Sequence, residues 1–436
     1  MLDKFYKQFK SGTDIRGVAS EGVEGQPVNL TDDVVARMAD GFVLWLSKKV
    51  SKAPETLTIS IGRDSRISGP HIVSICSERF KRCGATVLDC SLASTPSMFM
   101  TTVDLGCDGA LQITASHHPF NRNGLKFFTR EGGLEGSDIE QILEYAQNGD
   151  SPEEKTCGEI RKVDYMTDYA KGLCKKIKKE VNAEDYDHPL KGFKIVVDAG
   201  NGAGGFYADK VLSVLGADTT GSRYLEPDGM FPNHIPNPED ATAMASICEA
   251  VKEANADLGV IFDTDVDRGG AVDNKGNEIN RNRLVAVAAA IALEGNEGGT
   301  VVTDSITSSG LKEFIEDTLG GQHYRYRRGY KNVIDKALEL NAQGINCPLA
   351  IETSGHAAMK ENYFLDDGAY LCTKIIIKAA QMRKEGKELD ELTAALKEPV
   401  ESKEVRFKIL ESDFRACGEK IIGDLTAYSM AHDGWN

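Results

Sequence analysis

The feature that most constrains this chain is a threefold recurrence of a short apolar run, a polar loop with glycine and a helix-like stretch. The runs and their loops occupy 57–69, 194–205 and 300–310, and the helix-like stretches follow at 71–84, 206–216 and 311–320. Strand, loop and helix in this order are typical of α/β layers built on parallel strands. Ligands of such sheets bind beyond the carboxyl ends of the strands, so we expect the functional residues in these loops.

The chain has 436 residues, more than a single hydrophobic core usually supports, which favours about three domains. Polar stretches at 175–192, 293–299 and 383–403 are candidate boundaries. The first is charged and lacks a sustained apolar run, so we expect a linker there.

The net charge and the cysteine pattern limit the partners and the cellular compartment that we expect for this protein. The net charge of -16 argues against nucleic-acid and anionic-membrane partners, although a local cluster of Arg and Lys can still bind an anionic substrate. The ten cysteines form no CxxC pair, which indicates reduced packing residues. No apolar run approaches the roughly 20 residues of a membrane span, and the N-terminal residues lack the apolar core of a signal peptide. We expect a cytoplasmic protein.

One loop carries a candidate nucleophile. A strand-like run ends in Ala115, Ser116 and His117, and Lys126 follows ten residues after the serine. A serine at a strand end beside histidine suits nucleophilic chemistry, and Lys126 suits proton transfer or phosphate binding. A surface hairpin with a solvated serine explains the same residues equally well.

A second loop carries a candidate metal site. Asp263, Asp265 and Asp267 follow a buried-looking strand, with Arg268 next. Carboxylates on alternate residues of a turn converge on one hard cation, and three ligands favour Mg²⁺. The spacing excludes an EF-hand, which needs a distal Glu. The alternative is a solvated acidic turn.

A third loop combines Glu352, Ser354 and His356. Carboxylate, hydroxyl and imidazole at this spacing suit a polyhydroxy ligand, although a polar strand-to-helix loop is the simpler interpretation. The Asp–Asp–Gly at 366–368 predicts the start of a helix with an aspartate N-cap.

Arginines lie in two further loops. Arg16 lies in SGTDIRG, and Arg63 and Arg66 lie in GRDSR. One guanidinium group can bind two phosphate oxygens at once. Structural ion pairs with Asp14 and Asp64 are at least as probable for each arginine alone.

Taken in order, the motifs GTDIRG, GRDSR, TASHHP with NGLK, DTDVDR, GYK and ETSGH resemble the α-D-phosphohexomutases, the family of phosphoglucomutase and phosphomannomutase. The resemblance covers about 1–395. It implies three similar α/β domains with mixed or parallel sheets around a central cleft, which we place at 1–185, 186–295 and 296–395. The tail, 396–436, resembles the start of an incomplete fourth domain and lacks that domain's phosphate-binding loop.

The resemblance also implies roles for single residues. It places a phosphoserine at Ser116, which also supplies a metal ligand beside the three aspartates. Residues assigned to catalysis are Ser116, Lys126, His117, Arg16, Arg268 and His356, with Lys126 the first choice for proton transfer. Residues assigned to substrate binding are Glu352, Ser354, Gly329, Tyr330, Lys331 and Arg63.

The implied reaction interconverts hexose 1-phosphate and hexose 6-phosphate of glucose or mannose. It needs Mg²⁺ and passes through a hexose 1,6-bisphosphate, which also serves as activator. The ETSGH form resembles the phosphomannomutase/phosphoglucomutase branch. An amino-sugar phosphate mutase, a non-catalytic sugar-phosphate-binding homologue and a magnesium phosphatase are the alternatives. The partner is a hexose phosphate, and the sequence leaves the oligomeric state open.

Overall fold

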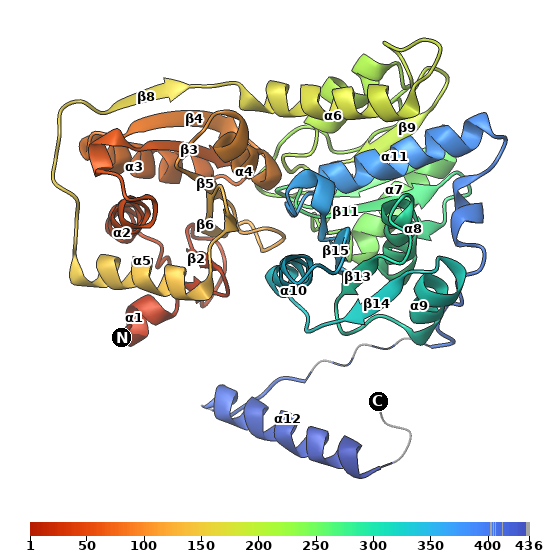
Figure 1. The fold of residues 1–436 in the computed structure, drawn as a ribbon. Coiled ribbons are helices and arrows are strands. Elements are labelled where there is room, and N and C mark those ends of the chain that lie inside the picture. The colour runs from red at the N-terminus through yellow and green to blue at the C-terminus, as the bar shows by residue number, and fades with distance from the viewer. Residues whose placement is uncertain (402, 404, 406, 412, 433–436) are drawn as a thin grey trace. The chain divides into compact units, whose positions relative to one another are not determined.

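The structure is a computed structural model that describes residues 1–401, 403, 405, 407–411 and 413–432. The chain forms two compact units, Met1–Glu398 and Pro399–Asn436. Three separate sheets lie in the first unit, so the fold is mixed α/β (Figure 1).

The first sheet has the strand order β1-β2-β6-β5-β3-β4-β8, with β7 paired to β6. The three central neighbours β5, β3 and β4 are parallel, whereas β6 runs antiparallel to β5 and to β2. Its elements are β1 (Lys10–Ser11), β2 (Asp14–Val18), β3 (Thr58–Arg63), β4 (Thr86–Leu92), β5 (Gly109–Ile113), β6 (Arg122–Thr129), β7 (Gly132–Gly133), β8 (Glu159–Lys162), α1 (Lys4–Lys7), α2 (Asp32–Val50), η1 (Pro54–Thr56), α3 (Gly69–Arg82), α4 (Thr95–Asp104) and α5 (Gly136–Asn148).

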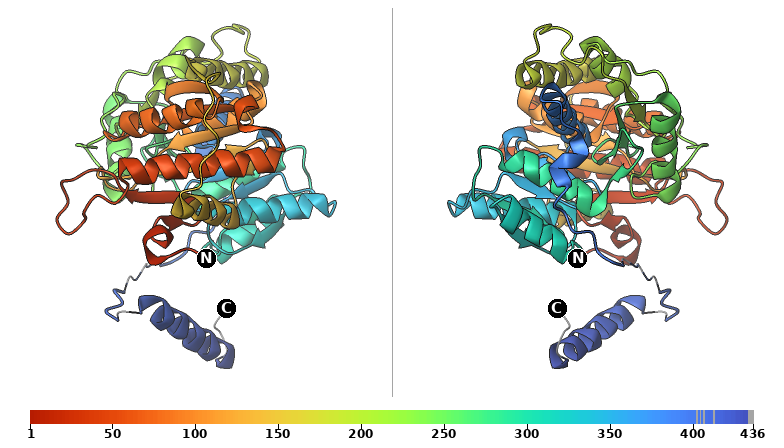
Figure 2. Two further views of the ribbon diagram at one scale, coloured as in Figure 1. Left: turned by 90° about the vertical axis from the view of Figure 1, so that its left-hand side faces the viewer. Right: turned by 90° about the vertical axis from the view of Figure 1, so that its right-hand side faces the viewer.

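Alternation along β6 shows how this sheet divides two cores. Phe127 packs in the cluster that contains α2, α3 and α5, whereas its neighbour Phe128 packs with α4 and α6 (Tyr165–Val181). Successive strand residues point to opposite faces, so one strand serves both layers. Figure 2 shows α2, α3 and α5 covering the outer face of the sheet in its left view.

The second and third sheets are each four-stranded, in the orders β12-β11-β10-β9 and β14-β13-β15-β16. Each joins parallel strands to an antiparallel edge: β9 and β10 are parallel, as are β14, β13 and β15. Their elements are β9 (Ile195–Asp198), η2 (Tyr207–Leu212), η3 (Ser213–Leu215), α7 (Ala241–Ala254), β10 (Leu258–Phe262), β11 (Gly269–Asp273), β12 (Glu278–Ile279), α8 (Arg281–Leu293), β13 (Thr300–Thr303), α9 (Ser309–Glu313), η4 (Phe314–Thr318), β14 (Gln322–Arg325), α10 (Tyr330–Ala342), β15 (Leu349–Ile351), β16 (Ala357–Met359), η5 (Lys360–Asn362), α11 (Gly368–Lys384) and η6 (Leu389–Thr393).

Two predicted helices differ from a regular α-helix. The stretch at 206–216 forms a π-helical segment, η2, and then a 3₁₀ turn, η3. The stretch at 311–320 continues from α9 into a second π-helical segment, η4. Apolar spacing alone predicts a helix but does not distinguish these hydrogen-bond patterns, whose donor-to-acceptor spacings differ by about one residue.

The predicted linker at 175–192 is wrong in its first third, because α6 extends through Val181. Ile177 and Val181 continue the buried face of Leu173, one helical turn apart each time. Lys179 between them is exposed, whereas Lys178 is partly buried. α6 therefore joins the first sheet to the second as a packed helix.

The predicted domain boundaries near 185 and 295 fall between α6 and β9 and between α8 and β13. One hydrophobic cluster runs from α4 through both smaller sheets, so these regions share a core. The boundaries stay predictions. The second unit contains α12 (Phe414–Ala431), capped by Asp413. The predicted fourth-domain segment, 396–436, includes positions outside the described residues and also stays a prediction.

Within the described part of the chain, no helix combines the length and apolarity that crossing a membrane requires.

Candidate active site

Ser116 lies on a tight turn directly after β5. Its backbone is left-handed, with φ +51°, and its amide donates to Thr114 Oγ1 at 2.9 Å. A non-glycine residue in this region is uncommon and marks a conformation that its surroundings enforce. The Ser116 side chain is buried, and its Oγ lies 3.2 Å from Asp263 Oδ2 and 3.3 Å from His117 Nδ1.

Arg66 enforces this turn. Its guanidinium is fully buried and forms an ion pair with Asp64 at 3.1 Å. It also donates to four backbone carbonyls of the loop, those of Ser116, His118, Pro119 and Arg122. The Arg66 guanidinium therefore supplies hydrogen-bond donors to carbonyl oxygens of this turn. Buried backbone groups require such partners. Arg66 thus follows the structural interpretation rather than the phosphate-binding one.

The three aspartates occupy the turn between β10 and β11. Asp263, Asp265 and Asp267 are all buried, and one carboxylate oxygen from each lies within 4.8 Å of the others. Val266, between two of them, has φ +69°, which is unusual for a β-branched residue. A solvated acidic turn is excluded by this burial.

Repulsion among the three carboxylates of the turn contributes to shifts in their pKa values. Burial, then the charges of Asp267 and Asp265, raise the pKa of Asp263 well above its usual range. Burial and Asp267 raise the pKa of Asp265 to about 6. Burial acts in the same direction on Asp267, but Lys126, His356 and Arg268 lower its pKa well below the usual range.

The turn fits a divalent cation. Within the described residues, Asp265 Oδ1 and Asp267 Oδ1 are buried without a hydrogen-bond donor. Unpaired buried carboxylate oxygens are costly, and a cation removes that cost. Three carboxylate oxygen donors suit Mg²⁺, which usually completes its shell with waters or phosphate oxygens.

Lys126, on β6, reaches the same turn. Its Nζ lies 2.8 Å from Asp267 Oδ2 and 4.6 Å from the centroid of the Tyr330 ring. Burial acts to lower the pKa of Lys126, but Asp267 and Tyr330 raise it well above its ordinary value. In this arrangement Lys126 is an ammonium group that can donate a proton.

The two histidines after Ser116 are neutral. Burial, followed by the charge of Arg268, lowers the pKa of His117 to about 3. Burial and Arg16 lower the pKa of His118 to about 4. Their rings stack at 5.3 Å. A neutral His117 beside Ser116 Oγ can accept a proton there.

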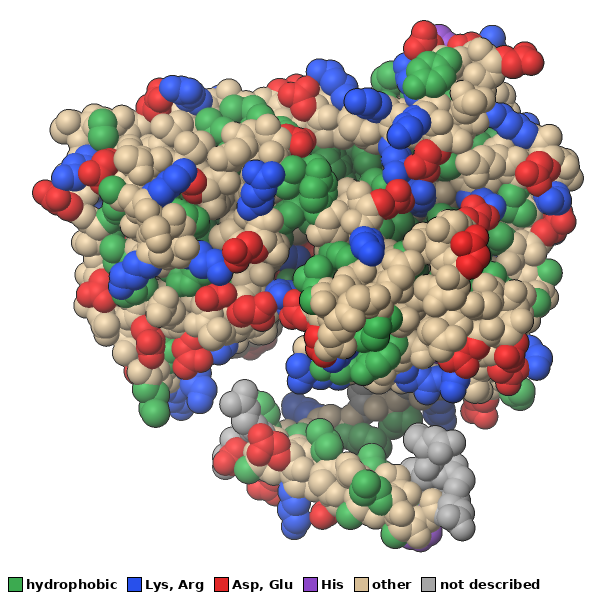
Figure 3. Space-filling view, viewed as in Figure 1, with side chains coloured by type: hydrophobic (Ala, Val, Ile, Leu, Met, Phe, Trp, Pro, Cys, Tyr) green, Lys and Arg blue, Asp and Glu red, His purple; other side chains and the backbone are tan. Residues whose placement is uncertain are grey.

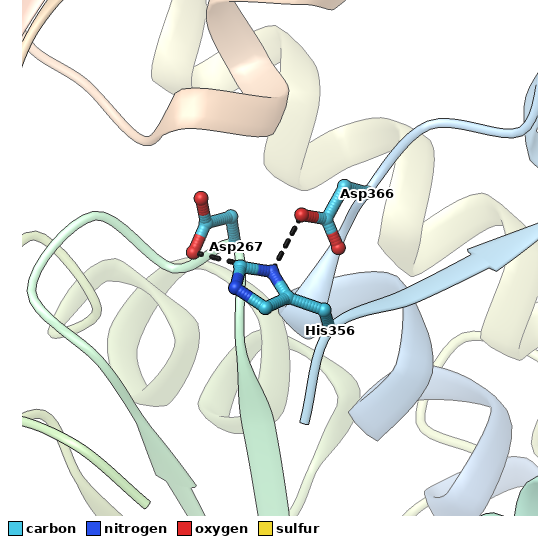
Figure 4. A group of neighbouring side chains, drawn as sticks. All are labelled: Asp267, His356 and Asp366. Carbon is cyan, nitrogen blue, oxygen red and sulfur yellow. Dashed lines mark hydrogen bonds and ion pairs between the residues drawn. The ribbon is translucent and has the colours of Figure 1, made fainter. Parts of the chain in front are cut away.

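Arg268 joins the second and third sheets at the site. Its backbone bridges to His356, its Nε donates to His356 Nε2 at 2.8 Å and its Nη2 lies 3.4 Å from Ser116 Oγ. His356 Nδ1 in turn lies 2.6 Å from Asp366 Oδ2 and 3.8 Å from Asp267 Oδ1 (Figure 4). These last three residues form a second group with spacing suitable for a metal.

The third loop lies beside this group. Glu352 Oε1 accepts from the Gly329 amide at 2.5 Å, and Ser354 Oγ donates to Glu352 Oε2 at 3.3 Å. Tyr330 stacks on His356 with ring centroids 5.1 Å apart, and its hydroxyl lies 3.1 Å from Thr13 Oγ1. The structure therefore brings the third loop and the GYK segment together.

Three other predicted residues have structural partners. Arg16 pairs with Asp14 at 3.0 Å, but its Nε is buried and unpaired among the described residues. Lys331 pairs with Glu135 and Asp335. The Arg63 guanidinium donates to the carbonyl of its neighbour Asp64. In the described part of the chain no hydrogen bond or ion pair links Arg63 to Ser116 or to the aspartate turn.

Sequence reasoning missed several residues of the site. Thr95, at the start of α4, contacts Asp265 through both its hydroxyl and its amide. Asp366 was grouped with the helix cap, although only Asp367 caps α11. The doubled aspartate was an available signal, because one cap needs one carboxylate. Thr95 carried no signal at all.

The site residues lie where two parts of the first unit meet, and the space-filling view shows a hollow along this boundary (Figure 3). Ser116 is 3% exposed and Lys126 is 5% exposed.

Comparison with known proteins adds family evidence. Residues 7–153, 168–276 and 280–400 match the families described as phosphoglucomutase/phosphomannomutase alpha/beta/alpha domains I, II and III. A phosphomannomutase/phosphoglucomutase of Pseudomonas syringae pv. tomato is 31% identical over 336 residues, which cover 76% of this chain and 68% of that protein. A phosphoglucosamine mutase of Lactobacillus helveticus is 29% identical over 395 residues, 89% of this chain and 81% of that protein.

Among solved structures, a phosphoglucomutase/phosphomannomutase family protein of Burkholderia thailandensis aligns with a TM-score of 0.74 and 25% sequence identity. The alignment covers 92% of this chain and 81% of that chain.

Proposed function

Because the chain belongs to the phosphoglucomutase/phosphomannomutase family, we propose that it is a mutase that interconverts hexose 1-phosphate and hexose 6-phosphate through a phosphorylated Ser116. The observation that carries this proposal is the position of Ser116 Oγ. It lies within hydrogen-bonding distance of Asp263, at 3.2 Å, and of Arg268, at 3.4 Å. A hydroxyl held between a buried acidic turn and a guanidinium is placed to carry a phosphoryl group.

Each transfer exchanges one P–O bond for another. The bond from phosphorus to Ser116 Oγ breaks, and a bond from phosphorus to a sugar hydroxyl oxygen forms. The sugar hydroxyl loses its proton, and Ser116 Oγ takes up a proton. The resulting hexose 1,6-bisphosphate returns its other phosphoryl group to Ser116 by the reverse exchange.

The residues present suggest how the protons move. His117 is neutral and lies 3.3 Å from Ser116 Oγ, so it suits proton exchange at the serine. Lys126 is the candidate for proton exchange at the sugar oxygen: as an ammonium group it suits the return transfer, in which the sugar oxygen gains a proton and neutral His117 takes the proton from Ser116 Oγ. The first transfer uses the same two groups in their opposite protonation states.

Asp263, Asp265 and Asp267 would hold Mg²⁺, with an oxygen on Ser116 as a further ligand. When bound, the ion supplies charge neutralisation for the transferring phosphoryl group. Arg268 adds fixed positive charge beside Ser116. The charge of Arg16 acts on Asp265 and His117.

Substrate recognition is proposed for the third loop. Glu352 and Ser354 offer a carboxylate and a hydroxyl to sugar hydroxyls, because a carboxylate repels phosphate but accepts well from O–H groups. Gly329, Tyr330, Lys331 and Arg63 complete the proposed substrate-binding set. We place the reaction in the cytoplasm.

The test combines mass and turnover. Purified protein incubated with hexose 1,6-bisphosphate and Mg²⁺ should gain the mass of one phosphoryl group, and Ser116→Ala should lose both that adduct and nearly all mutase activity. His118→Ala is the neighbouring control. Glucose, mannose and glucosamine 1-phosphates are assayed in parallel.

Each alternative has its own outcome. Preference for the amino sugar would assign the activity named for the Lactobacillus helveticus relative. A binding protein would show no adduct, and a phosphatase would release phosphate without isomerisation. Ser116→Ala with wild-type turnover would end the proposal.

A further inference from the structure

Four groups form a continuous line of contacts through the site. Asp366 Oδ2 meets His356 Nδ1 at 2.6 Å, His356 Nε2 meets Arg268 Nε at 2.8 Å, and Arg268 Nη2 reaches Ser116 Oγ at 3.4 Å. The three residues behind the serine are each buried. A buried line of this kind fixes each member through the next.

The contacts determine which nitrogen of His356 carries its proton. A guanidinium has only donors, so His356 Nε2 accepts from Arg268 and bears no hydrogen. An imidazole ring whose Nε2 bears no hydrogen keeps one proton, on its other nitrogen. That proton lies on Nδ1 and is donated to Asp366. The other oxygen of Asp366 accepts from the Ala357 amide at 3.1 Å.

This arrangement leaves His356 no lone pair or proton for a substrate. Both ring nitrogens are engaged with protein groups, and one ring face is covered by Tyr330. A general acid or base must reach the proton that it moves, directly or through one water. The geometry therefore argues against His356 as a proton-transfer group.

It also argues against a metal on Asp267, His356 and Asp366 (Figure 4). A metal on Nδ1 would displace its proton while Nε2 still accepted from Arg268. The ring would then carry no proton, which neutral imidazole does not allow without moving the arginine.

The backbone holds both ends of the line close together. The Gly368 amide donates to the Val266 carbonyl at 3.1 Å. A Cβ on Gly368 would lie 2.3 Å from the Arg268 carbonyl carbon, so only glycine permits this approach. The segment that carries Asp366 is therefore pressed directly against the segment that carries Arg268.

We propose that Asp366 and His356 are positioning residues that aim the Arg268 guanidinium at the phosphoryl group on Ser116. This inference rests on the proposed function. A guanidinium is planar, and its orientation decides which of its N–H groups point at a phosphate. Asp366 holds the orientation of the His356 ring, and His356 Nε2 holds Arg268 Nε. The position of Nε then sets the plane of the Arg268 guanidinium, whose Nη2 reaches Ser116.

The first test reads the tautomer and needs no activity. Protein with ¹⁵N-labelled histidine is studied by two-bond ¹⁵N–¹H correlation, and the His356→Gln spectrum identifies the His356 signals among the eight histidines. We expect a protonated Nδ1 and an unprotonated Nε2 in the wild-type protein. A proton on Nε2 would overturn the proposal.

The second test uses substitutions at His356. Glutamine places an amide oxygen near the position of Nε2 and can accept from Arg268, but it cannot exchange protons near neutral pH. If the role is positioning, His356→Gln should keep at least about tenfold more kcat than His356→Ala. Equal losses in the two variants would indicate proton transfer and contradict the inference.

The third test is a double-mutant cycle. Asp366→Asn should lower kcat about ten- to a hundredfold with little change in KM, and the same change should cost little more in the Arg268→Lys protein. Asp367→Asn is the matched control, because this neighbouring buried carboxylate caps α11 and contacts Tyr169 instead. Thermal unfolding checks that each variant is folded.

The outcomes separate the two proposals. A wild-type protein without phosphoserine or turnover would defeat the proposed function, while the tautomer remained measurable. If the wild-type protein turned over normally but the losses in kcat caused by Asp366→Asn and Arg268→Lys were fully additive, only the positioning role would be defeated. Zn²⁺ binding that is lost in His356→Gln, with the Mg²⁺ response retained, would assign a metal site and likewise defeat it.

Discussion

Two neighbouring strands of the second sheet, β9 and β10, have aspartates at or just beyond their carboxyl ends, and these aspartates have opposite surroundings. Asp198, at the end of β9, accepts from His234, Ser246 and the Gly200 amide, so both its oxygens are paired. Asp265 and Asp267, just beyond β10, each keep one buried oxygen without a donor among the described residues.

The difference separates a carboxylate that is fully paired within the protein from two carboxylates that we propose to be metal ligands. Both kinds are buried at a strand end, so position does not distinguish them. Hydrogen bonding distinguishes Asp198, whose oxygens are both paired, from Asp265 and Asp267, whose carboxylates lie within reach of one another and whose unpaired oxygens could be paired by a cation. The comparison can be challenged by four measurements.

The largest effect is expected at the paired carboxylate. Asp198→Ala leaves the buried His234 and Ser246 without their acceptor, and should lower the free energy of unfolding by about 3–5 kcal/mol. Urea unfolding measures it. Asp218→Ala, at an exposed aspartate that follows η3, should change stability by less than about 0.5 kcal/mol. A similar small change for Asp198→Ala would show that its pairing is not structural.

The unpaired carboxylates should respond to metal. Mg²⁺ at a hundred times its Kd should stabilise the protein by about 2.7 kcal/mol. Asp265→Asn should abolish this gain and should not destabilise the metal-free protein, because it removes one of three repelling charges. Thermal unfolding with Mg²⁺ and with chelator tests both statements. Unchanged Mg²⁺ stabilisation of the variant would place the ion elsewhere.

The pairing of Asp198 should depend on pH. Burial opposes the charge of His234, but Asp198 and the Ile235 carbonyl raise its pKa above the ordinary 6.5. The stabilisation is therefore complete below about pH 6.5 and is lost as pH rises through the raised pKa of the folded protein. His234→Gln should cost about 2 kcal/mol at pH 6 and less at pH 9. If the difference in unfolding free energy between the wild-type protein and His234→Gln grew with pH, the assigned direction of the pH dependence would be wrong.

The smallest effect is expected at Thr95, which donates to Asp265 from α4. Thr95→Val removes this hydroxyl at nearly constant volume and should cost about 1 kcal/mol. The loss should be smaller with Mg²⁺ bound if the ion takes over part of the pairing. Thr95→Ser, which keeps the hydroxyl, serves as the control in the same unfolding assay.

The strand-end loops were predictable because their chemistry is local. Ser116, the three aspartates and the Glu352 loop each follow an apolar run, and sheet geometry brings such loops together. The Asp367 cap of α11 was also predicted and is confirmed. These features depend on residues within a few positions of one another.

What the sequence could not show depends on distant contacts. Arg66 was one of two equivalent arginines in GRDSR until the fold placed it beneath the Ser116 loop, 50 residues away. The role of Asp366 required knowing that His356 faces it. The end of α6 was a different failure, because Ile177 and Val181 carried a helical period that the surrounding lysines obscured.

The burial of Ser116 sets a demand on motion. Ser116 as a residue is 3% exposed, so in the proposed reaction the site opens for a hexose phosphate to reach its hydroxyl. Opening the boundary must separate Tyr330 from Thr13 and Lys331 from Glu135, contacts that join the third sheet's segment to the first. In the proposed reaction the bisphosphate has to reorient before it leaves. How long the site stays closed therefore decides whether the bound bisphosphate is converted to product or dissociates before the second transfer.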